Sequence, residues 1–157
     1  MFDRLRNSRW FWKYRHLWNP KWTEGYKNLN APHRKVLVEA ILKHNPKFIL
    51  EVGCGAGANL RLIHELSPYH RLSPHSELDG VDINPKAVKV GKKWNGDFAL
   101  ITIGSFDDLG PGDSYYDVAF TDTAFMYARD KVKALKELKR VAKKVILYEW
   151  ETLIEVL

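Results

Sequence analysis

The segment FILEVGCGAGA, residues 48–58, constrains the fold of this chain more than any other part of its sequence. It begins as an apolar run that favours a strand, turns through three alternating glycines and continues into a helical pattern. Glycine has no Cβ, so it adopts positive φ and lets a ligand approach the backbone closely. This order of strand, glycine-rich turn and helix is typical of α/β proteins that bind nucleotide-like ligands at the end of their first strand.

The glycines by themselves leave the ligand open. Gly53, Gly55 and Gly57 alternate, but Gly53, Gly55 and Ala58 also satisfy the dinucleotide-binding pattern Gly-x-Gly-x-x-Gly/Ala. Glu51 stands two residues before the first glycine. A carboxylate at this place repels a pyrophosphate and attracts a sulfonium or an amino group. The turn therefore favours a ligand that carries hydroxyls and a positive charge.

Helical and strand patterns alternate along the rest of the chain. Helical spacing is expected over residues 33–44, 58–66, 85–94 and 131–142, and strands over 48–52, 78–83, 98–103, 117–121 and 145–148. This alternation predicts a Rossmann-like α/β fold, a doubly wound and mostly parallel sheet with helices on both faces. Ligands of such sheets bind at the carboxyl ends of the strands. After residue 148 there is room for one more short element, so the fold is expected to be short at its C-terminus.

Four motifs in this order resemble those of the class I S-adenosylmethionine-dependent methyltransferases, in particular the small type 11/12-like domains. They are LEVGCGAG at 50–57, LDGVDINP at 78–85, GSFDDL at 104–109 and YDVAFTD at 116–122. The resemblance covers roughly residues 35–150 and implies a Rossmann-like domain over 35–157. It implies that this domain binds S-adenosylmethionine, transfers its methyl group to a small molecule, protein or RNA, and leaves S-adenosylhomocysteine as product.

The resemblance also implies a cofactor site at the strand ends. Asp82 ends the second strand at about the spacing expected of a carboxylate that holds ribose hydroxyls. Ser105 stands where the family often has an acid for the adenine amino group, with Asp107 or Asp108 as an alternative acceptor, and Phe106 is expected against the base. The predicted cofactor-binding set is Glu51, Gly53, Cys54, Gly55, Gly57, Asp82, Ile83, Ser105, Phe106 and Thr121.

The exit of the fourth strand is expected at the methionine end of the cofactor. The family often has a His-His pair shortly after it, where this chain has Met126 and Tyr127. Asp122 is predicted to orient or deprotonate the acceptor, and Tyr127 to offer it a hydroxyl; a helix cap or loop acid is the alternative for Asp122. Methyl transfer depends chiefly on proximity and alignment, with a base needed only for some acceptors. The Asn/Asp-Pro-Pro-Tyr/Trp signature is missing, which argues against adenine N6 methylation.

Residues 1–34 form a basic, aromatic arm ahead of this domain. The chain has a net charge of +6, and its first 35 residues hold nine Lys or Arg against two acids. Short helices and turns are expected there because Pro20 and Pro32 interrupt it. Three interpretations stay open: a cover packed on the domain, a lid over the site, and a surface that binds nucleic acid. The aromatic residues of the arm include Trp10, Phe11, Trp12, Tyr14, Trp18, Trp22 and Tyr26.

Other features narrow the class of protein. Cys54 is the single cysteine, so an internal disulfide is excluded, and it is predicted to be a small packing residue rather than a nucleophile. His64, His70 and His75 lack a convincing ligand set, so no metal is expected. There is no apolar run long enough to span a bilayer and no secretory signal, which predicts a cytoplasmic protein.

Two alternatives to a methyltransferase remain at this point. The dinucleotide register permits an NAD(P)-dependent oxidoreductase, although Glu51 and the later loops argue against it. Ser105, the missing His-His pair and the short C-terminus permit a non-catalytic binding module that uses its basic arm to hold RNA or a protein. A sheet edge left open by a short C-terminus also predicts a covering partner, such as a second copy in a homodimer.

Overall fold

A computed structural model describes residues 9–19, 21, 25–68, 74–150 and 152–156 of the chain. Its strands form a 6-stranded sheet in the order β3-β2-β1-β4-β5-β6, parallel except for β6. The strands are β1 Phe48–Val52, β2 Glu77–Asp82, β3 Leu100–Ile103, β4 Tyr116–Asp122, β5 Ala142–Glu149 and β6 Thr152–Val156. The helices are α2 Arg9–Trp18, α4 Pro32–Leu42, α5 Ala58–Leu66, α7 Pro85–Asn95 and α8 Lys131–Val141, with the 3-10 helix η1 at Phe125–Tyr127. The predicted α/β fold is confirmed.

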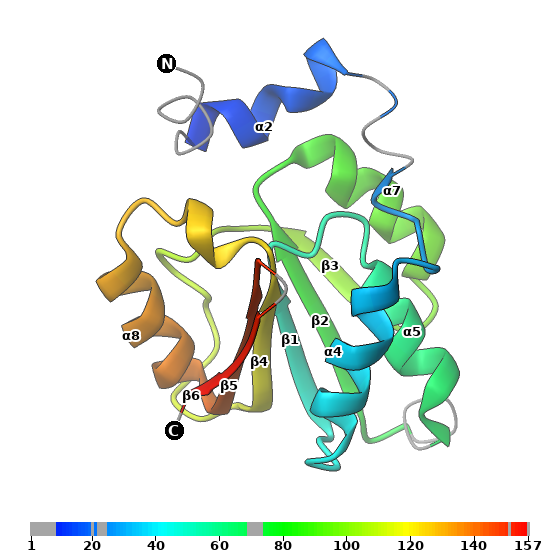
Figure 1. Cartoon of the computed structure of the whole chain (residues 1–157), viewed down its shortest axis with the longest axis vertical. Coiled ribbons are helices and arrows are strands. Elements are labelled where there is room, and N and C mark those ends of the chain that lie inside the picture. The colour runs from blue at the N-terminus through cyan, green and yellow to red at the C-terminus, as the bar shows by residue number, and fades with distance from the viewer. Residues whose placement is uncertain (1–8, 20, 22–24, 69–73, 151, 157) are drawn as a thin grey trace.

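Helices cover both faces of the sheet. Figure 1 shows α4, α5 and α7 on one side and α8 on the other, with α2 lying across the end where the parallel strands finish. Successive strand residues alternate between the two layers: Ile49 packs with the α4 and α5 core, and Leu50 with the α8 core. Because both faces are buried, the middle parts of β1, β4 and β5 are mostly apolar.

The structure moves the start of the fifth strand. We predicted it at residue 145, but β5 begins at Ala142, directly after α8. Ala142 pairs with Tyr116 in the parallel ladder. Lys143 and Lys144 interrupt the apolar pattern by which a strand is recognised, so the sequence did not indicate this start. In the structure, Lys143 pairs with Asp117 and Lys144 with Glu155.

The last described residues form the additional short element that the sequence left room for. β6 turns back at Trp150, whose φ is 48°, and runs antiparallel along β5 from Thr152 opposite Glu149 to Val156 opposite Val145. Leu153 packs against the core, and β6 forms one edge of the sheet. A homodimer through this edge stays a prediction.

Asn84 ties helix α2 of the arm to the domain. Asn84 caps α7 by accepting hydrogen bonds from the Lys86 and Ala87 amides, as its place before Pro85 predicts. Its side-chain amide also donates to the carbonyl of Trp12 in α2, 3.0 Å away. Three residues used in the sequence predictions lie outside the described residues: Pro20, Trp22 and His70. Within the described residues, no helix has the length and apolarity needed to cross a membrane.

Candidate functional site

A cavity of ≈ 560 Å³ opens at the carboxyl ends of the parallel strands, beneath α2. Every predicted site residue except Gly57 and Thr121 lines it. The volume lies within the range of small-molecule and cofactor sites. The predicted residues in its wall are Glu51, Gly53, Cys54, Gly55, Asp82, Ile83, Ser105, Phe106, Asp122 and Tyr127.

The glycine turn is shaped by close approach as well as by backbone conformation. Gly53 has φ 79°, and a Cβ there would lie 2.3 Å from the Cβ of Ala124. Gly55 has φ 56°, and a Cβ there would lie 2.8 Å from the ring of Tyr26 in the arm. Gly57 precedes α5 as its N-cap and faces the core rather than the cavity. The turn therefore brings bare backbone to the cavity wall.

Asp82 holds this turn in place. Its Oδ2 accepts the Gly55 amide at 2.7 Å, and its Oδ1 accepts the Asn84 amide at 2.8 Å. Burial raises the pKa of Asp82, and the backbone hydrogen bonds from Asn84, Gly55 and Ile83 oppose that rise. Each carboxylate oxygen has a second acceptor site. Asp82 can therefore hold the turn and still accept hydrogen bonds from a diol in the cavity that it lines.

Glu51 is buried at the floor of the cavity with only half of its carboxyl group satisfied. It is 2% exposed, and its Oε1 accepts a hydrogen bond from Asn59 at 2.7 Å. Its Oε2 is buried and has no hydrogen-bond partner among the described residues. Burial raises the pKa of Glu51 to about 8, with the Asn59 hydrogen bond lowering it and Asp122 raising it further. A buried polar atom left unpaired costs about 1–3 kcal/mol, so this oxygen is suited to a donor on a ligand.

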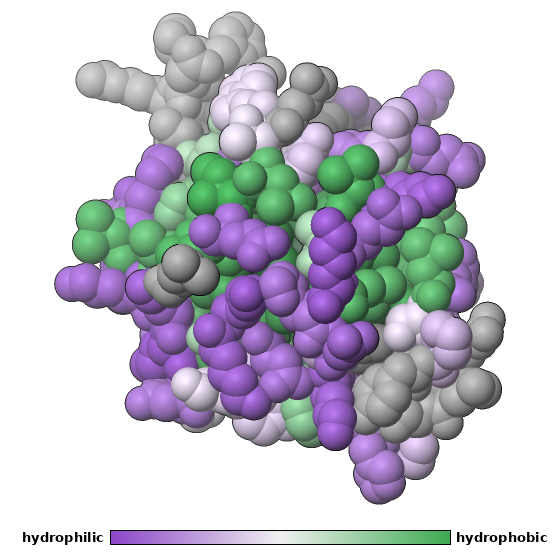
Figure 2. Space-filling view, turned by 60° about the horizontal axis from the view of Figure 1, so that its bottom comes forward, coloured by the Kyte–Doolittle hydropathy of each residue, from purple (hydrophilic) through white to green (hydrophobic). Residues whose placement is uncertain are grey.

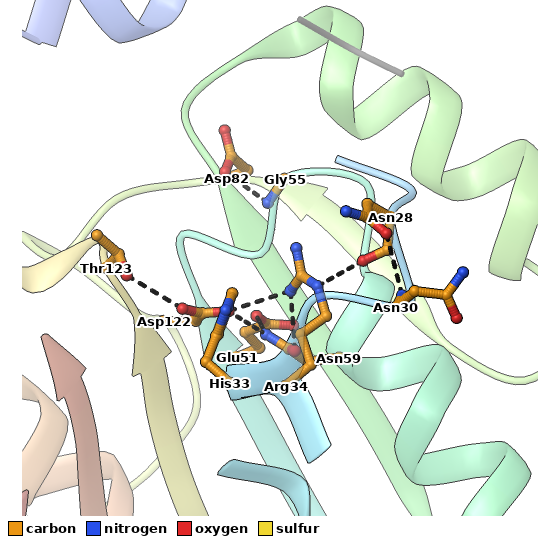
Figure 3. A network of polar contacts seen from close by, with 10 residues as sticks. All are labelled: Asn28, Asn30, His33, Arg34, Glu51, Gly55, Asn59, Asp82, Asp122 and Thr123. Atoms are coloured by element: carbon orange, nitrogen blue, oxygen red, sulfur yellow. Dashed lines mark hydrogen bonds and ion pairs between the residues drawn. The ribbon is translucent and has the colours of Figure 1, made fainter. Parts of the chain in front are cut away.

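Asp122 is the centre of a polar network beside Glu51 (Figure 3). Its Oδ2 accepts hydrogen bonds from His33 Nε2 at 3.0 Å, Arg34 Nη1 at 3.1 Å and Asn59 Nδ2 at 3.0 Å. Its Oδ1 accepts the Thr123 hydroxyl at 3.1 Å. The side chains of Asp122 and Arg34 are 8% and 14% exposed, so their ion pair is largely shielded from water.

Three members of this network were not among the predicted site residues. His33 and Arg34 lie in the first turn of α4, and Asn59 lies in the first turn of α5. Arg34 also donates to Asn59 Oδ1 at 2.9 Å and to the carbonyl of Asn28 at 2.7 Å, which fixes the end of the arm. Their positions in the sequence could have indicated them. The polar residues after Pro32 and after the glycine turn stand at the starts of two helices, where their side chains reach the strand ends.

The loop after β3 supplies a further part of the wall. Ser105, Phe106 and Asp107 line the cavity, whereas Asp108 does not and instead accepts the Gly110 amide at 3.1 Å. The Ser105 hydroxyl accepts the Asp107 amide at 3.4 Å. Of the two alternative acceptors considered for the adenine amino group, Asp107 is therefore the one at the cavity.

Thr121 acts behind the wall instead of within it. It is fully buried, and its hydroxyl donates to Glu149 Oε1 at 3.1 Å. Glu149 also accepts the amides of Phe125 at 3.0 Å and Met126 at 3.3 Å. Because these amides belong to η1, Glu149 and Thr121 together position the segment that carries Tyr127.

Aromatic residues of the arm and of η1 meet at the cavity. The rings of Trp12 and Tyr127 lie 4.6 Å apart between centroids, and both residues line it. Arg15 packs its guanidinium over the rings of Phe11 and Trp12.

Cys54 is buried in the wall of the cavity, and burial raises the pKa of its thiol. These are the properties of a packing residue and not of a nucleophile.

Residues 50–145, more than half of the chain, match the family described as "Methyltransferase domain". The chain belongs to this methyltransferase family. The class predicted from the four motifs is therefore confirmed, and the family match favours it over the dinucleotide-dependent oxidoreductase that the glycine register also permitted.

Two curated relatives have different acceptors in their names. A demethylmenaquinone methyltransferase of Thermotoga maritima is 31% identical over 116 residues, which are 74% of this chain and 48% of the relative. A malonyl-[acyl-carrier protein] O-methyltransferase of Anoxybacillus flavithermus is 27% identical over 112 residues, 68% of this chain and 40% of the relative. This methyltransferase-family chain thus spans less than half the length of the curated relatives that it matches.

A solved structure shares the fold. The plantazolicin methyltransferase BpumL, crystallised with a monoazolic desmethylPZN analog and SAH, aligns with a TM-score of 0.67 at 20% identity. The alignment covers 92% of this chain and 58% of that one. The high coverage of this chain shows that the arrangement of its strands and helices is that of a methyltransferase domain.

Proposed function

We propose that this methyltransferase-family domain binds S-adenosylmethionine in the cavity and transfers its methyl group to an acceptor that enters beneath α2. The observation that carries the proposal is the unpaired Oε2 of Glu51, which shares the cavity with Asp82. The carboxyl group of Glu51 suits an ammonium, and that of Asp82 suits a ribose diol. A molecule that offers both, joined through a sulfonium, fits this donor and acceptor set.

The residues of the cavity divide among the parts of the cofactor. Asp82 accepts the ribose hydroxyls, and Phe106 with Ser105 and Asp107 contacts the adenine. Glu51 accepts the ammonium of the methionine part. Arg34 has guanidinium donors beyond those used for Asn28, Asn59 and Asp122, so it can also receive the carboxylate.

The arm acts as a lid in this proposal. Asn84 fixes α2 to the domain through the Trp12 carbonyl, and Arg34 fixes the end of the arm through the Asn28 carbonyl. Trp12, Asn19, Lys21, Gly25 and Tyr26 then complete the cavity wall. A lid excludes water and holds the acceptor close, which is the main requirement of methyl transfer. Tyr127 and Asp122 face the acceptor from the domain side.

Calorimetric titration with S-adenosylmethionine, S-adenosylhomocysteine and NAD tests the cofactor. We expect binding of both sulfur compounds and not of NAD. Asp82→Ala should weaken S-adenosylhomocysteine binding by roughly 1.5–3 kcal/mol, the scale of a hydrogen bond to a charged group. Asp113→Ala, at an exposed acid away from the cavity, is the matched control. Binding of NAD alone, or unchanged affinity in Asp82→Ala, would contradict the proposed site.

Turnover separates an enzyme from a binding module. The acceptor classes named by the relatives are a quinone ring and a malonyl group on a carrier protein. We would therefore offer labelled S-adenosylmethionine together with demethylmenaquinol, malonyl thioesters and an RNA pool. Label in one of these products supports the proposed transfer. Tight cofactor binding with no transfer to any of them supports a non-catalytic module that uses the arm for a partner.

A further inference from the structure

We propose that His33 is the proton acceptor of this site, oriented by Asp122, and that the methyl acceptor is therefore a group that loses a proton. Hydroxyls, amines and acidic carbon atoms are groups of this kind. The inference rests on the proposed function, because it assigns a step of that methyl transfer to a residue that the motifs do not include.

The hydrogen bonds of Asp122 make it a poor base itself. Its Oδ2 already receives donors from His33, Arg34 and Asn59, and its Oδ1 receives the Thr123 hydroxyl. Protonation of this carboxylate would break the ion pair with Arg34 inside a shielded site. Asp122 is instead placed to orient a neighbour, as the carboxylate does in a carboxylate–histidine pair.

The same contacts determine which nitrogen of His33 is available. An ionised carboxylate only accepts hydrogen bonds, so the proton of a neutral His33 must sit on Nε2, which lies 3.0 Å from Asp122 Oδ2. Nδ1 then carries the free electron pair. Nδ1 has no hydrogen-bond partner in the described part of the chain, and it is not one of the buried unpaired atoms there. The side chain is 32% exposed and lines the cavity.

Neighbouring groups hold the ring and set its electrostatic surroundings. The ring stacks on Tyr148 of β5 with centroids 5.3 Å apart and planes 19° from parallel. Asp122 of β4 stabilises a proton on the ring, Arg34 of α4 opposes it, and Glu51 of β1 lies in the same network. This is the geometry of a base whose cation is stabilised by a fixed carboxylate.

The proposed step balances without an added reagent. A new bond forms between the acceptor atom and the methyl carbon while the carbon–sulfur bond breaks. The electron pair of that bond stays on sulfur, which becomes a neutral thioether. The proton of the acceptor atom passes to His33 Nδ1, and the imidazolium remains paired with Asp122 until solvent takes the proton.

The first test compares His33→Gln with a matched control. Glutamine keeps a donor for Asp122 but cannot take up a proton, and His44→Gln changes a histidine that pairs with Glu155 away from the cavity. With demethylmenaquinol as probe, we expect kcat of His33→Gln to fall by roughly 10²–10⁴-fold. KM and S-adenosylhomocysteine affinity should stay close to the wild-type values, and the acidic limb of the pH–rate profile should disappear. Unchanged kcat with the limb retained would overturn the proposal, as would an equal loss of cofactor binding.

The second test needs no acceptor and decides the matter if the wild type does not methylate this probe. Nitrogen NMR of the ¹⁵N-labelled chain reports the tautomer of His33. We expect Nε2 to be protonated and Nδ1 bare in the neutral ring, and we expect Asp122→Asn to remove that preference. A proton on Nδ1 in the wild type would overturn the assignment. Failure of S-adenosylhomocysteine to bind in a separate titration would instead count against the proposed cofactor site.

Discussion

Asp117 at the amino end of the sheet and Glu51 at its carboxyl end differ in how fully their carboxyl groups are hydrogen-bonded. At the amino end, Asp117 accepts Lys143 Nζ at 2.8 Å and the amides of Lys47 and Phe48 at 2.8 and 3.1 Å. Figure 2 brings this end forward and shows hydrophilic residues gathered across it, with hydrophobic patches beside them. At the carboxyl end, Glu51 is buried, and one of its oxygens has no partner in the part of the chain that the structure describes. Both oxygens of Asp117 are satisfied by the chain itself, whereas one oxygen of Glu51 has no partner among the described residues.

The pKa values of Asp117 and Glu51 shift in opposite directions because of this difference in hydrogen bonding. Burial raises the pKa of Asp117, but the hydrogen bonds from Lys143, Lys47 and Phe48 outweigh it and hold that pKa below its ordinary value. Burial of Glu51 is offset only in part by the Asn59 hydrogen bond and the nearby Arg34 cation, so its pKa rises to about 8. Perturbed carboxyl groups in a cavity are typical of functional sites, so the raised pKa of Glu51 supports the site proposed at this end of the sheet.

The largest expected difference concerns two glycines with the same positive φ. Gly53 and Gly110 both have φ 79°, but a Cβ on Gly53 would overlap Ala124, while a Cβ on Gly110 would meet no atom within 4 Å. Gly53→Ala should lower the free energy of unfolding by about 4 kcal/mol, because left-handed strain adds to overpacking. Gly110→Ala should lower it by about 1 kcal/mol from strain alone. Urea unfolding measures both, and equal losses would show that the glycine turn is not sterically special.

The next comparison removes one cation at each end. Arg34→Met leaves the shielded carboxylate of Asp122 without its cation and should destabilise the fold by about 3 kcal/mol. Lys143→Met breaks an ion pair whose lysine is 62% exposed, so the loss should stay below about 1 kcal/mol. Urea unfolding at pH 7 gives both values. A loss at Lys143 as large as that at Arg34 would remove the distinction between the two ends.

The last comparison concerns a pH dependence of stability that has opposite signs at the two ends. Between pH 4.5 and about 8 the folded state keeps the proton of Glu51 that the unfolded state releases. Over that range, stability should therefore fall as pH rises, by up to about 1.4 kcal/mol per pH unit. Glu51→Gln should abolish this fall, so its stability relative to the wild type should improve toward pH 8.

Asp117→Asn is the matched variant for that measurement. Because the pKa of Asp117 is lowered, its contribution is present above its unfolded value of 3.8 and is lost as pH falls through the folded value. Unfolding curves from pH 3 to pH 9 should show the Asp117 effect only at the acid end. A constant difference between Glu51→Gln and the wild type across this range would contradict the raised pKa.

Much of the fold and part of the site follow from the sequence because their signals are local. The run from Phe48 to Val52 and the glycines after it occupy neighbouring positions, and the helical spacing of α5 and α8 lies within single elements. The position of Asp82 at the end of the second strand could also be predicted, and β2 ends at this residue. Asn84 stands directly before Pro85, a local position typical of a helix cap, and it caps α7 in the structure.

What the sequence alone did not determine are the contacts between distant segments. His33 and Arg34 meet Asp122 across 89 and 88 positions, and Asn84 meets the Trp12 carbonyl across 72. No local pattern carries such pairings, because they exist only once the sheet has placed the start of α4 beside the end of β4. The sequence therefore determined the α/β fold, the methyltransferase family and the line of strand-end residues. The tertiary structure decided which of them share a cavity, that Thr121 stands behind it, and that Asp122 is held by a histidine and an arginine.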